Sequence, residues 1–390
     1  MHVRPALASV LAAVALAVAP ASGQAATPAQ VIAALNAQRT ANGIPAGIVE
    51  LPDWSAKCAK HVSWMEQNNT LAHQETPGSP GYSDEGNQAG TNAVLAAGNV
   101  NWTSPARNPY LTAPFHLLQV LFPRLAGMGV HESANGAFGC HTTFPGYSRS
   151  SPAGDVLYSY PGDGKTASWQ ETAHEFPSVP GDAVGLPEGK TTGPNMEVFW
   201  DGAGSEAAFA NPSTCADVCD PPMRNLVSAT LKDAKGTSIA VKTVGHQQSS
   251  LTLIGSGFVI PVKPLKPGSS YTATATFSSG DSANRTFTDS WSFRTSKLPS
   301  PKKAVKIVAS NGAGGLKAQL IGRDVYDGRT AKFTIDYGNG KLTGTAKLGG
   351  TLTATRVPKG RTAVITVKVA AFKVGSVKVP AATAAKRIKG

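Results

Sequence analysis

The sequence lacks any long apolar run beyond its first residues. No later segment approaches the roughly 20 consecutive apolar residues that a membrane-spanning helix needs. The start is an uncharged Ala, Val and Leu run from Ala6 to Val18, followed by Gly23-Gln24-Ala25, which is typical of a cleavage site. We therefore expect residues 1–25 to be a signal peptide. The remainder is expected to be secreted, either free or associated with the cell surface, without a transmembrane segment.

Cysteine is also scarce, with four in 390 residues. An even, small number of cysteines suits disulfides in an oxidising compartment. Cys215 and Cys219 are predicted to close a small disulfide loop, because the turn-rich segment around them holds no further His or Cys to complete a metal site. Cys58 and Cys140 either form a bridge that adds about 4 kcal/mol to the stability or remain two buried thiols.

Acidic residues are almost missing from the last quarter of the chain. Residues 297–390 hold 19 Lys and Arg against 3 Asp and Glu, a net +16 in a chain whose total is +12, so the preceding residues carry −4. Such a region is either a solvated surface or one that attracts anionic envelope polymers or lipid headgroups. Aromatic residues are few there and no nucleic-acid reading motif occurs, so nucleic acid is not an expected partner.

Helical signals are concentrated near the N-terminus. The capping box Thr27-Pro28-Ala29-Gln30 predicts the start of a first helix, and apolar spacing predicts others from about Asp53 and about Ala113. Short strand-like runs follow them. Residues 26–165 are therefore expected to form an α+β domain.

The rest of the chain shows mainly strand signals. Residues 168–296 carry short alternating strands typical of an immunoglobulin-like β-sandwich. A linker is expected at 297–303, and residues 304–380 predict a second, basic β-rich domain with the character of a small sandwich. We expect residues 381–390 to be a disordered tail.

Two histidines and one carboxylate carry the clearest chemistry: His73, Glu75 and His116. Imidazole and carboxylate together bind divalent metals or transfer protons. If the segment around His73 is extended, the i, i+2 spacing points His73 and Glu75 to the same side. With His116 they would supply the three protein ligands of a catalytic zinc. The alternative is two hydrogen-bonded histidines in a cleft, with Glu75 fixing the tautomer of one.

These residues, in their order along the chain, resemble the bacterial secreted branch of the CAP superfamily (cysteine-rich secretory, antigen 5 and pathogenesis-related proteins). The resemblance covers roughly residues 27–165. It rests on these segments: Leu35-Asn36-Ala37-Gln38-Arg39, Trp54 with Ala59 and His61, Leu71-Ala72-His73, Ala89-Gly90-Thr91-Asn92 and Ala113-Pro114-Phe115-His116.

The resemblance implies an α-β-α sandwich with a central cleft, which in many members holds two His and two Glu. His73 and His116 stand at the histidine positions. Thr91 replaces one glutamate, because the family usually has Gly-Glu-Asn where this chain has Gly-Thr-Asn92. No acidic residue lies between Asn101 and Pro114 to supply the other. Glu75 is a candidate to replace one of the two glutamates, and Asp84-Glu85 is a further candidate that could reach in from the loop.

Two functions fit these observations, and we favour the first. One is a secreted, non-enzymatic binding protein whose cleft would, as the resemblance implies, take a small apolar molecule such as a sterol or fatty acid, or a protein partner, without a cofactor. The other is a hydrolase of peptide or cell-envelope substrates with a weakly held divalent metal such as zinc on His73, Glu75 and His116. A purely structural or adhesive protein is a third hypothesis. The expected cleft residues are His73, Glu75, Thr91, Asn92 and His116.

Overall fold

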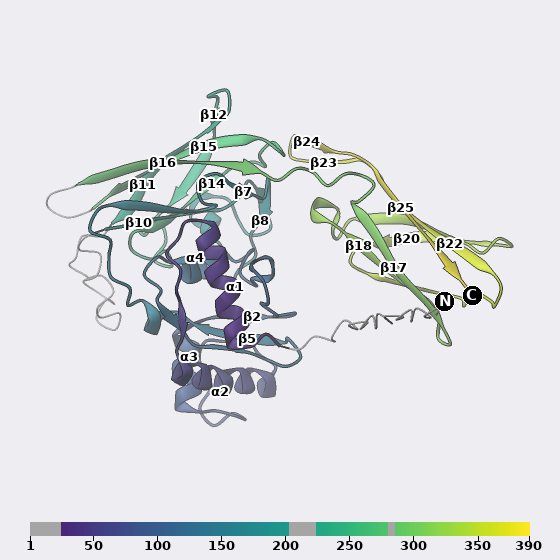
Figure 1. Cartoon of the computed structure of the whole chain (residues 1–390), viewed down its shortest axis with the longest axis horizontal. Coiled ribbons are helices and arrows are strands. Elements are labelled where there is room, and N and C mark those ends of the chain that lie inside the picture. The colour runs from purple at the N-terminus through teal and green to yellow at the C-terminus, as the bar shows by residue number, and fades with distance from the viewer. Residues whose placement is uncertain (1–24, 203–223, 280–284) are drawn as a thin grey trace, which may run out of the picture. The chain divides into compact units, whose positions relative to one another are not determined.

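The computed structural model of the chain describes residues 25–202, 224–279 and 285–390. The predicted signal peptide up to residue 24 and the predicted Cys215–Cys219 bridge lie outside these residues. Strands predominate over the described chain, which has four α-helices, and this fits the predicted α+β class (Figure 1). The chain divides into two compact units. Unit 1 comprises Met1–Ala34, Glu50–Pro109 and Met128–Thr142, and unit 2 comprises Leu35–Val49, Tyr110–Gly127 and Thr143–Gly390.

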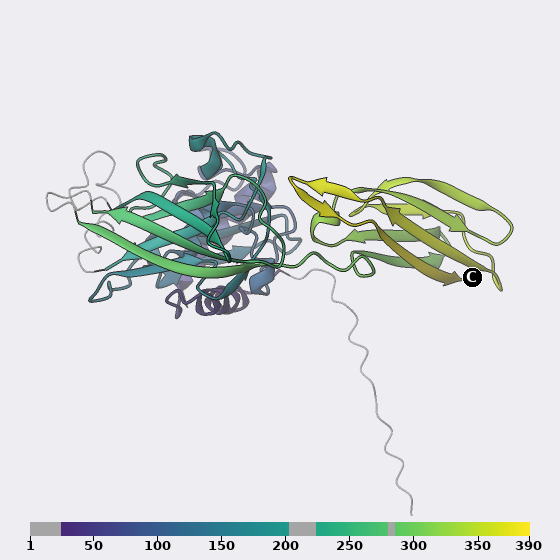
Figure 2. The same ribbon diagram turned by 90° about the horizontal axis from the view of Figure 1, so that it is seen from above.

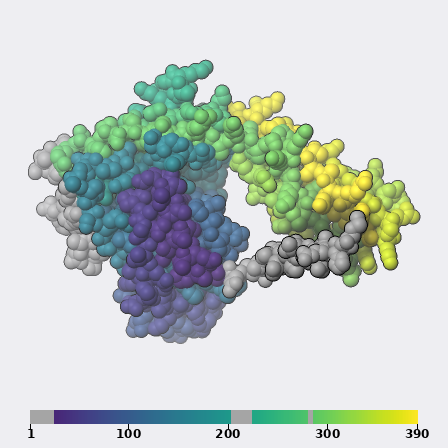
Figure 3. All heavy atoms as spheres, viewed as in Figure 1, coloured from purple at the N-terminus to yellow at the C-terminus, as the bar shows by residue number. Residues whose placement is uncertain are grey.

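Helix α1 (Pro28–Ala41) begins where the sequence predicts. The Thr27 amide donates to Gln30 Oε1 at 2.9 Å, and the Gln30 amide donates to Thr27 Oγ1 at 3.3 Å. This capping box satisfies two amides that the first turn would otherwise leave exposed. One side of the helix, with Val31 and Leu35, is buried, and the other is open to solvent, where its purple atoms are visible in Figure 3.

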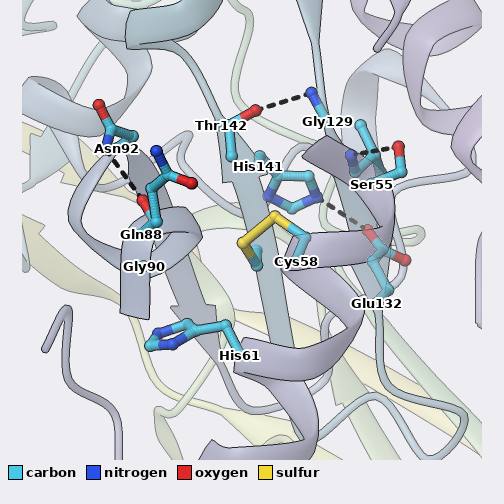
Figure 4. Close-up of a disulfide and its surroundings, with 12 residues drawn as sticks. Ser55, Cys58, His61, Gln88, Gly90, Asn92, Gly129, Glu132, His141 and Thr142 are labelled. Atoms are coloured by element: carbon cyan, nitrogen blue, oxygen red, sulfur yellow. Dashed lines mark hydrogen bonds and ion pairs between the residues drawn. A yellow bond between two sulfur atoms is a disulfide. The ribbon is translucent and has the colours of Figure 1, made fainter. Parts of the chain in front are cut away.

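Unit 1 places two helices against a small antiparallel sheet. Helices α2 (Pro52–Asn68) and α3 (Asp84–Thr91) pack together, and α2 also packs on the sheet. The strand order is β2-β5-β4, with bounds Ala93–Ala97, Phe138–Thr142 and Val130–Glu132. The disulfide Cys58–Cys140 joins α2 to the middle strand β5 (Figure 4), so of the two alternatives for these cysteines the bridge is the one that forms.

Helix α3 was not predicted from the sequence. Its eight residues include two glycines and no regular apolar stripe, so periodicity gives little sign of it. The helix depends on its cap, since Ser83 Oγ accepts a hydrogen bond from the Gly86 amide at 3.0 Å.

Unit 2 contains two sheets that share one core. Trp200, Phe277 and Trp291 belong to a single buried cluster that draws residues from both sheets. The result is a β-sandwich, in agreement with the prediction, and its long strands β15 and β16 run side by side in Figure 2. The sheet orders are β13-β14-β10-β6 and β12-β11-β15-β16-β7. The bounds are β6 Val156–Tyr160, β7 Lys165–Ala167, β10 Met196–Asp201, β11 Asn225–Asp233, β12 Ser238–Ile239, β13 Val241–Val244, β14 Ser256–Pro261, β15 Ser270–Ser278 and β16 Thr286–Thr295.

The predicted start of the sandwich at residue 168 was too late. Strand β6 pairs antiparallel with β10, and β7 pairs parallel with β16. Both strands therefore belong to the sandwich, although residues up to 165 were predicted to belong to the preceding domain. Their hydrogen-bond partners lie far along the chain, so their own sequence does not reveal which sheet they join.

The C-terminal domain is a second pair of sheets around one core. The orders are β17-β18-β21 and β20-β19-β22-β25. The bounds are β17 Val305–Gly312, β18 Gly315–Gly322, β19 Thr330–Asp336, β20 Lys341–Lys347, β21 Thr351–Ala354, β22 Thr362–Val369 and β25 Ala382–Lys389. The predicted disordered tail at 381–390 is thus wrong: β25 pairs with β22 over its whole length, and Ala382 and Ile388 are buried in the core.

The remaining elements are short. They are α4 Pro114–Leu121, β1 Val49–Glu50, β3 Gly127–Met128, β8 Glu171–Thr172, β9 Thr191–Thr192, β23 Phe372–Val374 and β24 Val377–Val379. None of the helices in the described ranges combines the length and the apolar character needed to span a membrane.

Loss of the Cys58–Cys140 bridge should destabilise the protein. The bridge closes a chain segment of 82 residues, so the double variant Cys58→Ala/Cys140→Ala should lose about 4 kcal/mol of unfolding free energy, measured by urea denaturation. The matched control is Cys215→Ser/Cys219→Ser, which leaves unit 1 unchanged. Equal unfolding midpoints for wild type and the Cys58/Cys140 variant would contradict the expectation.

Candidate functional site

Glu75 is bound to His61, which the sequence analysis named for the family resemblance but not as a site residue. Its Oε1 lies 3.0 Å from Nδ1 of His61, and its Oε2 accepts a hydrogen bond from the Ser83 amide at 2.8 Å. Nε2 of His61 faces the carbonyl oxygen of Ala72 at 2.9 Å. Both side chains are fully buried. Because both ring nitrogens face oxygen acceptors, the pair is best satisfied as a buried imidazolium and carboxylate.

The close approach of α3 to this pair requires glycine. A Cβ at Gly90 would lie 2.3 Å from Cε1 of His61, and one at Gly86 would lie 2.3 Å from Oε1 of Glu75. Side chains at these positions would push α3 away from α2. The His61–Glu75 pair and the two glycines therefore fix the two helices and the loop between them.

His73 lies in the same loop but faces a different partner. It is exposed, and its Nδ1 donates to the carbonyl oxygen of Gly90 at 2.8 Å. Thr91 and Asn92 end α3, and both side chains donate back to the carbonyl of Gln88, at 3.1 and 2.9 Å. Of the expected cleft residues, these two therefore stabilise the end of a helix.

His116 belongs to unit 2, where α4 positions it. Its Nδ1 is bound to Glu175 Oε1, and its ring stacks on Tyr110 with ring centroids 5.6 Å apart. The same carboxylate accepts the Phe115 and His116 amides at 2.9 and 2.8 Å. Glu175 thus caps the N-terminus of α4, whose own flanking residue Ala113 has no capping side chain, and fixes the ring carried by the first turn.

Unit 2 contains two further glutamates whose carboxyl groups are buried, Glu171 and Glu197. Glu197, in β10, is fully buried, and neither of its carboxyl oxygens has a hydrogen-bond partner among the described residues. Burial raises the pKa of Glu197 well above its ordinary value, and the charges of Glu171 and Glu175 raise it further. Burial also raises the pKa of Glu171 to about 7, although Asn195 donates two hydrogen bonds to its Oε2. Burial and the two neighbouring carboxylates therefore both favour the protonated form of Glu197.

The expected residues fall into two sets. His73, Glu75, Thr91 and Asn92 belong to unit 1, whereas His116 belongs to unit 2, and each histidine has its own partners. Across the ranges that the structure describes, no group of three or more His, Cys, Asp or Glu side chains is arranged to hold a metal ion. A carboxylate-bound imidazole can accept and donate protons, and the pair that His116 forms with Glu175 lies in unit 2.

Sequence reasoning missed the partner residues for different reasons. His61 follows Cys58 by three residues on the buried stripe of α2, and a polar group on such a stripe signals a buried partner. Glu197 stands in a strand whose six residues are all buried, which is a similar signal. Glu175 gives none, because it lies 59 residues from the helix that it caps.

A separate feature is the basic face of the C-terminal sheet β20-β19-β22-β25. Ile335, Ile365 and Val367 point into the core, so alternate residues on these strands point outward. In this sheet, which the structure describes throughout, the outward positions carry six cations and one acid: Lys332, Lys341, Lys347, Lys368, Arg387 and Lys389, with Asp336. We call these outward positions the basic face.

Two cations of the basic face lie directly opposite each other. Lys332 pairs with Lys368 across β19 and β22, and both are exposed. Like charges at opposed positions destabilise a sheet, because their Cβ atoms are only about 5 Å apart. Asp336 lies 3.3 Å from Lys341 and so neutralises a different cation.

The same domain has a hollow of about 440 Å³ that can take an anionic group. Arg356 and Arg361 line it together with Tyr337. A guanidinium group can donate two parallel hydrogen bonds to the oxygens of one carboxylate or phosphate group. A tyrosine ring beside it offers an apolar surface.

His61→Ala should destabilise the protein far more than His73→Ala. The first change leaves Glu75 buried without its charged partner, which costs roughly 3–5 kcal/mol. The second removes one hydrogen bond of an exposed side chain and should cost about 1 kcal/mol or less. Urea unfolding of both variants at pH 7 measures the difference, and similar losses for the two histidines would show that the His61–Glu75 pair is not structural.

Glu197→Gln should stabilise the protein at pH 8. A carboxyl whose pKa is raised on folding binds its proton more tightly in the folded state. The protonated carboxyl therefore favours the folded state fully at a pH below the ordinary pKa. The free energy of unfolding then falls as the pH rises from the ordinary pKa towards the pKa of the folded state. For Glu171 this window runs from about 4.5 to about 7, and for Glu197 it extends in the same direction. The glutamine amide carries no charge at any of these pH values, so the Glu197→Gln variant avoids this loss of unfolding free energy, which is on the order of 2 kcal/mol.

Unfolding free energies of wild type and Glu197→Gln at pH 5 and pH 8 test this. The two proteins should differ little at pH 5, and the variant should be more stable at pH 8. Glu188→Gln, which changes an exposed carboxylate of the same unit, serves as the control. An unchanged pH dependence in the Glu197 variant would contradict the assignment.

No protein-family model matches the sequence, and no curated protein matches it. Among solved structures, the chain is similar to dimeric latent PorU from Porphyromonas gingivalis, with 12% sequence identity and a TM-score of 0.21. The match covers 66% of this chain and 23% of that chain, so this chain spans less than a quarter of the length of PorU. A similarity at this TM-score supports no conclusion about fold or function.

Proposed function

We propose that the protein is a secreted, non-enzymatic binding protein that attaches to anionic polymers of a cell envelope through the basic face of its C-terminal domain. The opposed pair Lys332 and Lys368 carries the proposal. Two like charges held across neighbouring strands repel each other, and a polyanion laid over the face would relieve that repulsion. The next outward pair along the two strands, Thr334 and Thr366, keeps the face polar and offers hydroxyl groups to a hydrated polymer.

The N-terminal region has the second role in this proposal. We assign it to a CAP-like domain that takes a small apolar molecule or a protein partner, and we assign the following sandwich to an immunoglobulin-like spacer. The disulfide, the two helices of unit 1 on their sheet, and the order of the resembling segments along the chain support this assignment. The Cys58–Cys140 bridge also suits an extracellular protein.

Hydrolysis is the second candidate, because His116 is bound to Glu175 and lies in the unit that holds Glu171 and Glu197, whose pKa values are raised. In the version with a metal on His73, Glu75 and His116, Glu75 would have to leave His61 and the Ser83 amide. Metal analysis of the purified protein tests it: stoichiometric zinc that is lost in both His73→Ala and His116→Ala would favour the hydrolase.

Neutralising the opposed lysines should weaken polymer binding. A cation near an anionic surface contributes about 1 kcal/mol, so Lys332→Gln/Lys368→Gln should bind dextran sulfate about thirtyfold more weakly at low salt. Titration calorimetry over a range of salt concentrations measures this. The dependence of affinity on salt should also be shallower, because fewer charges are screened.

The matched control removes the same net charge from the other sheet. Lys306 and Lys317 are exposed on β17 and β18, and Lys306→Gln/Lys317→Gln should weaken binding only a few-fold. Equal losses in both variants would mean that net charge alone matters. Tighter binding to vesicles of phosphatidylcholine and phosphatidylglycerol than to the polymer would replace a polymer partner with a lipid surface.

A further inference from the structure

A buried carboxylate in unit 1 faces the start of the folded chain. Glu132, at the end of β4, is 4% exposed. The Trp102 amide donates to its Oε1 and Oε2 at 3.1 and 3.2 Å, and the Ala26 nitrogen lies 3.2 Å from Oε2. His141 Nε2 is 3.6 Å from Oε1. Figure 4 shows this ring and the Glu132 carboxylate joined beside the disulfide.

These contacts keep Glu132 ionised. Burial by itself would raise the pKa of this carboxyl, but the contact with His141 and the amides of Trp102 and Ala26 together lower it. An ionised carboxylate taken out of water favours a cation as partner over a neutral amide. His141 lies against the carboxylate and is fully buried.

Ala26 is the first residue after the cleavage signature Gly23-Gln24-Ala25. It is 4% exposed, and the next residue, Thr27, begins the capping box of α1. The position of the Ala26 nitrogen is therefore set on one side by the helix start and on the other by the Glu132 carboxylate.

We propose that cleavage of the Ala25–Ala26 peptide bond creates an α-ammonium group that docks on Glu132 as a buried ion pair. The peptide bond is hydrolysed by a signal peptidase with one water molecule, which leaves the carboxylate on Ala25 and the amino group on Ala26, and this amino group takes up a proton. The nitrogen then offers three N–H donors and a positive charge where the uncut chain offers one neutral amide. Glu132 is a binding site for the chain's own processed N-terminus.

This inference goes beyond the proposed function, because it concerns how export completes the N-terminal fold. Processing would pin the start of α1 to the β4 strand, next to the Cys58–Cys140 bridge. Binding of polymers by the C-terminal domain does not depend on it, so the two proposals fail independently.

The first test is the N-terminal residue of the secreted protein. The full chain is expressed in a secreting bacterium, and the protein in the medium is analysed by N-terminal sequencing and intact mass. A chain that begins at Ala26 is expected. A mature chain that begins at any other residue would overturn the proposal.

The second test compares three mature full-length chains, released from fusions by a protease that leaves a chosen first residue. The chains begin with Ala26, with an added Gly before Ala26, or with N-acetylated Ala26. The free Ala26 terminus should lower the unfolding equilibrium constant in urea at least about tenfold relative to the other two, because hydrogen bonds to charged groups are stronger than neutral ones.

The same three termini are then compared in the Glu132→Gln variant, which completes a double-mutant cycle. In the variant, the three termini should unfold at the same urea concentration, because no carboxylate remains to bind the ammonium group. Equal stability of the three termini on native Glu132 would overturn the proposal. If Glu132→Gln does not fold, the comparison on native Glu132 decides by itself.

Discussion

Removing charge from water is the constraint on which the arrangement of this chain depends. A buried ionised group costs several kcal/mol unless an opposite charge or several donors meet it. In unit 1, Glu75 is met by His61 and an amide, and Glu132 by His141 and two amides. In unit 2, Glu175 is met by two amides of α4 and by the histidine on that helix. Glu132 and Glu175 join segments that lie far apart in sequence, whereas Glu75 holds the loop after α2 against that helix.

Much of the fold could be predicted because its signals are local. The start of α1 follows from four residues, and α2, α4 and most strands follow from apolar spacing within one element. Elements without a local signal were missed. Helix α3 depends on a cap and on close packing at two glycines. Strand β25 was hidden by its charges, because Lys386 and Arg387 suggest a solvated tail, whereas pairing with β22 is what orders them.

The candidate site was predicted less well than the fold, because contacts between distant segments leave no local signal in the sequence. His73 and His116 could be selected by residue type, but the partners that define their roles are set by tertiary structure. Glu75 lies two residues from His73 and yet binds His61, because the loop turns one side chain inward and leaves the other exposed. His116 owes its fixed ring to Glu175, 59 residues away, and no spacing rule covers such a distance.

Buried and exposed charges of this chain differ in their partners, and this difference indicates where the binding function lies. The buried carboxylates Glu75 and Glu175 each meet a histidine and backbone amides. The buried Arg39 guanidinium donates to backbone carbonyls, including those of Pro45 and Val120. On the basic face, by contrast, Lys332 and Lys368 are opposed without a carboxylate between them, although Asp336 on the same strand is used for Lys341. A fold selected for stability alone would separate those lysines or neutralise one, since opposed like charges only cost free energy. Their presence on an exposed sheet face is physically reasonable when an external anion supplies the missing charge. The binding energy of that partner is then largest where the isolated protein is least favourable.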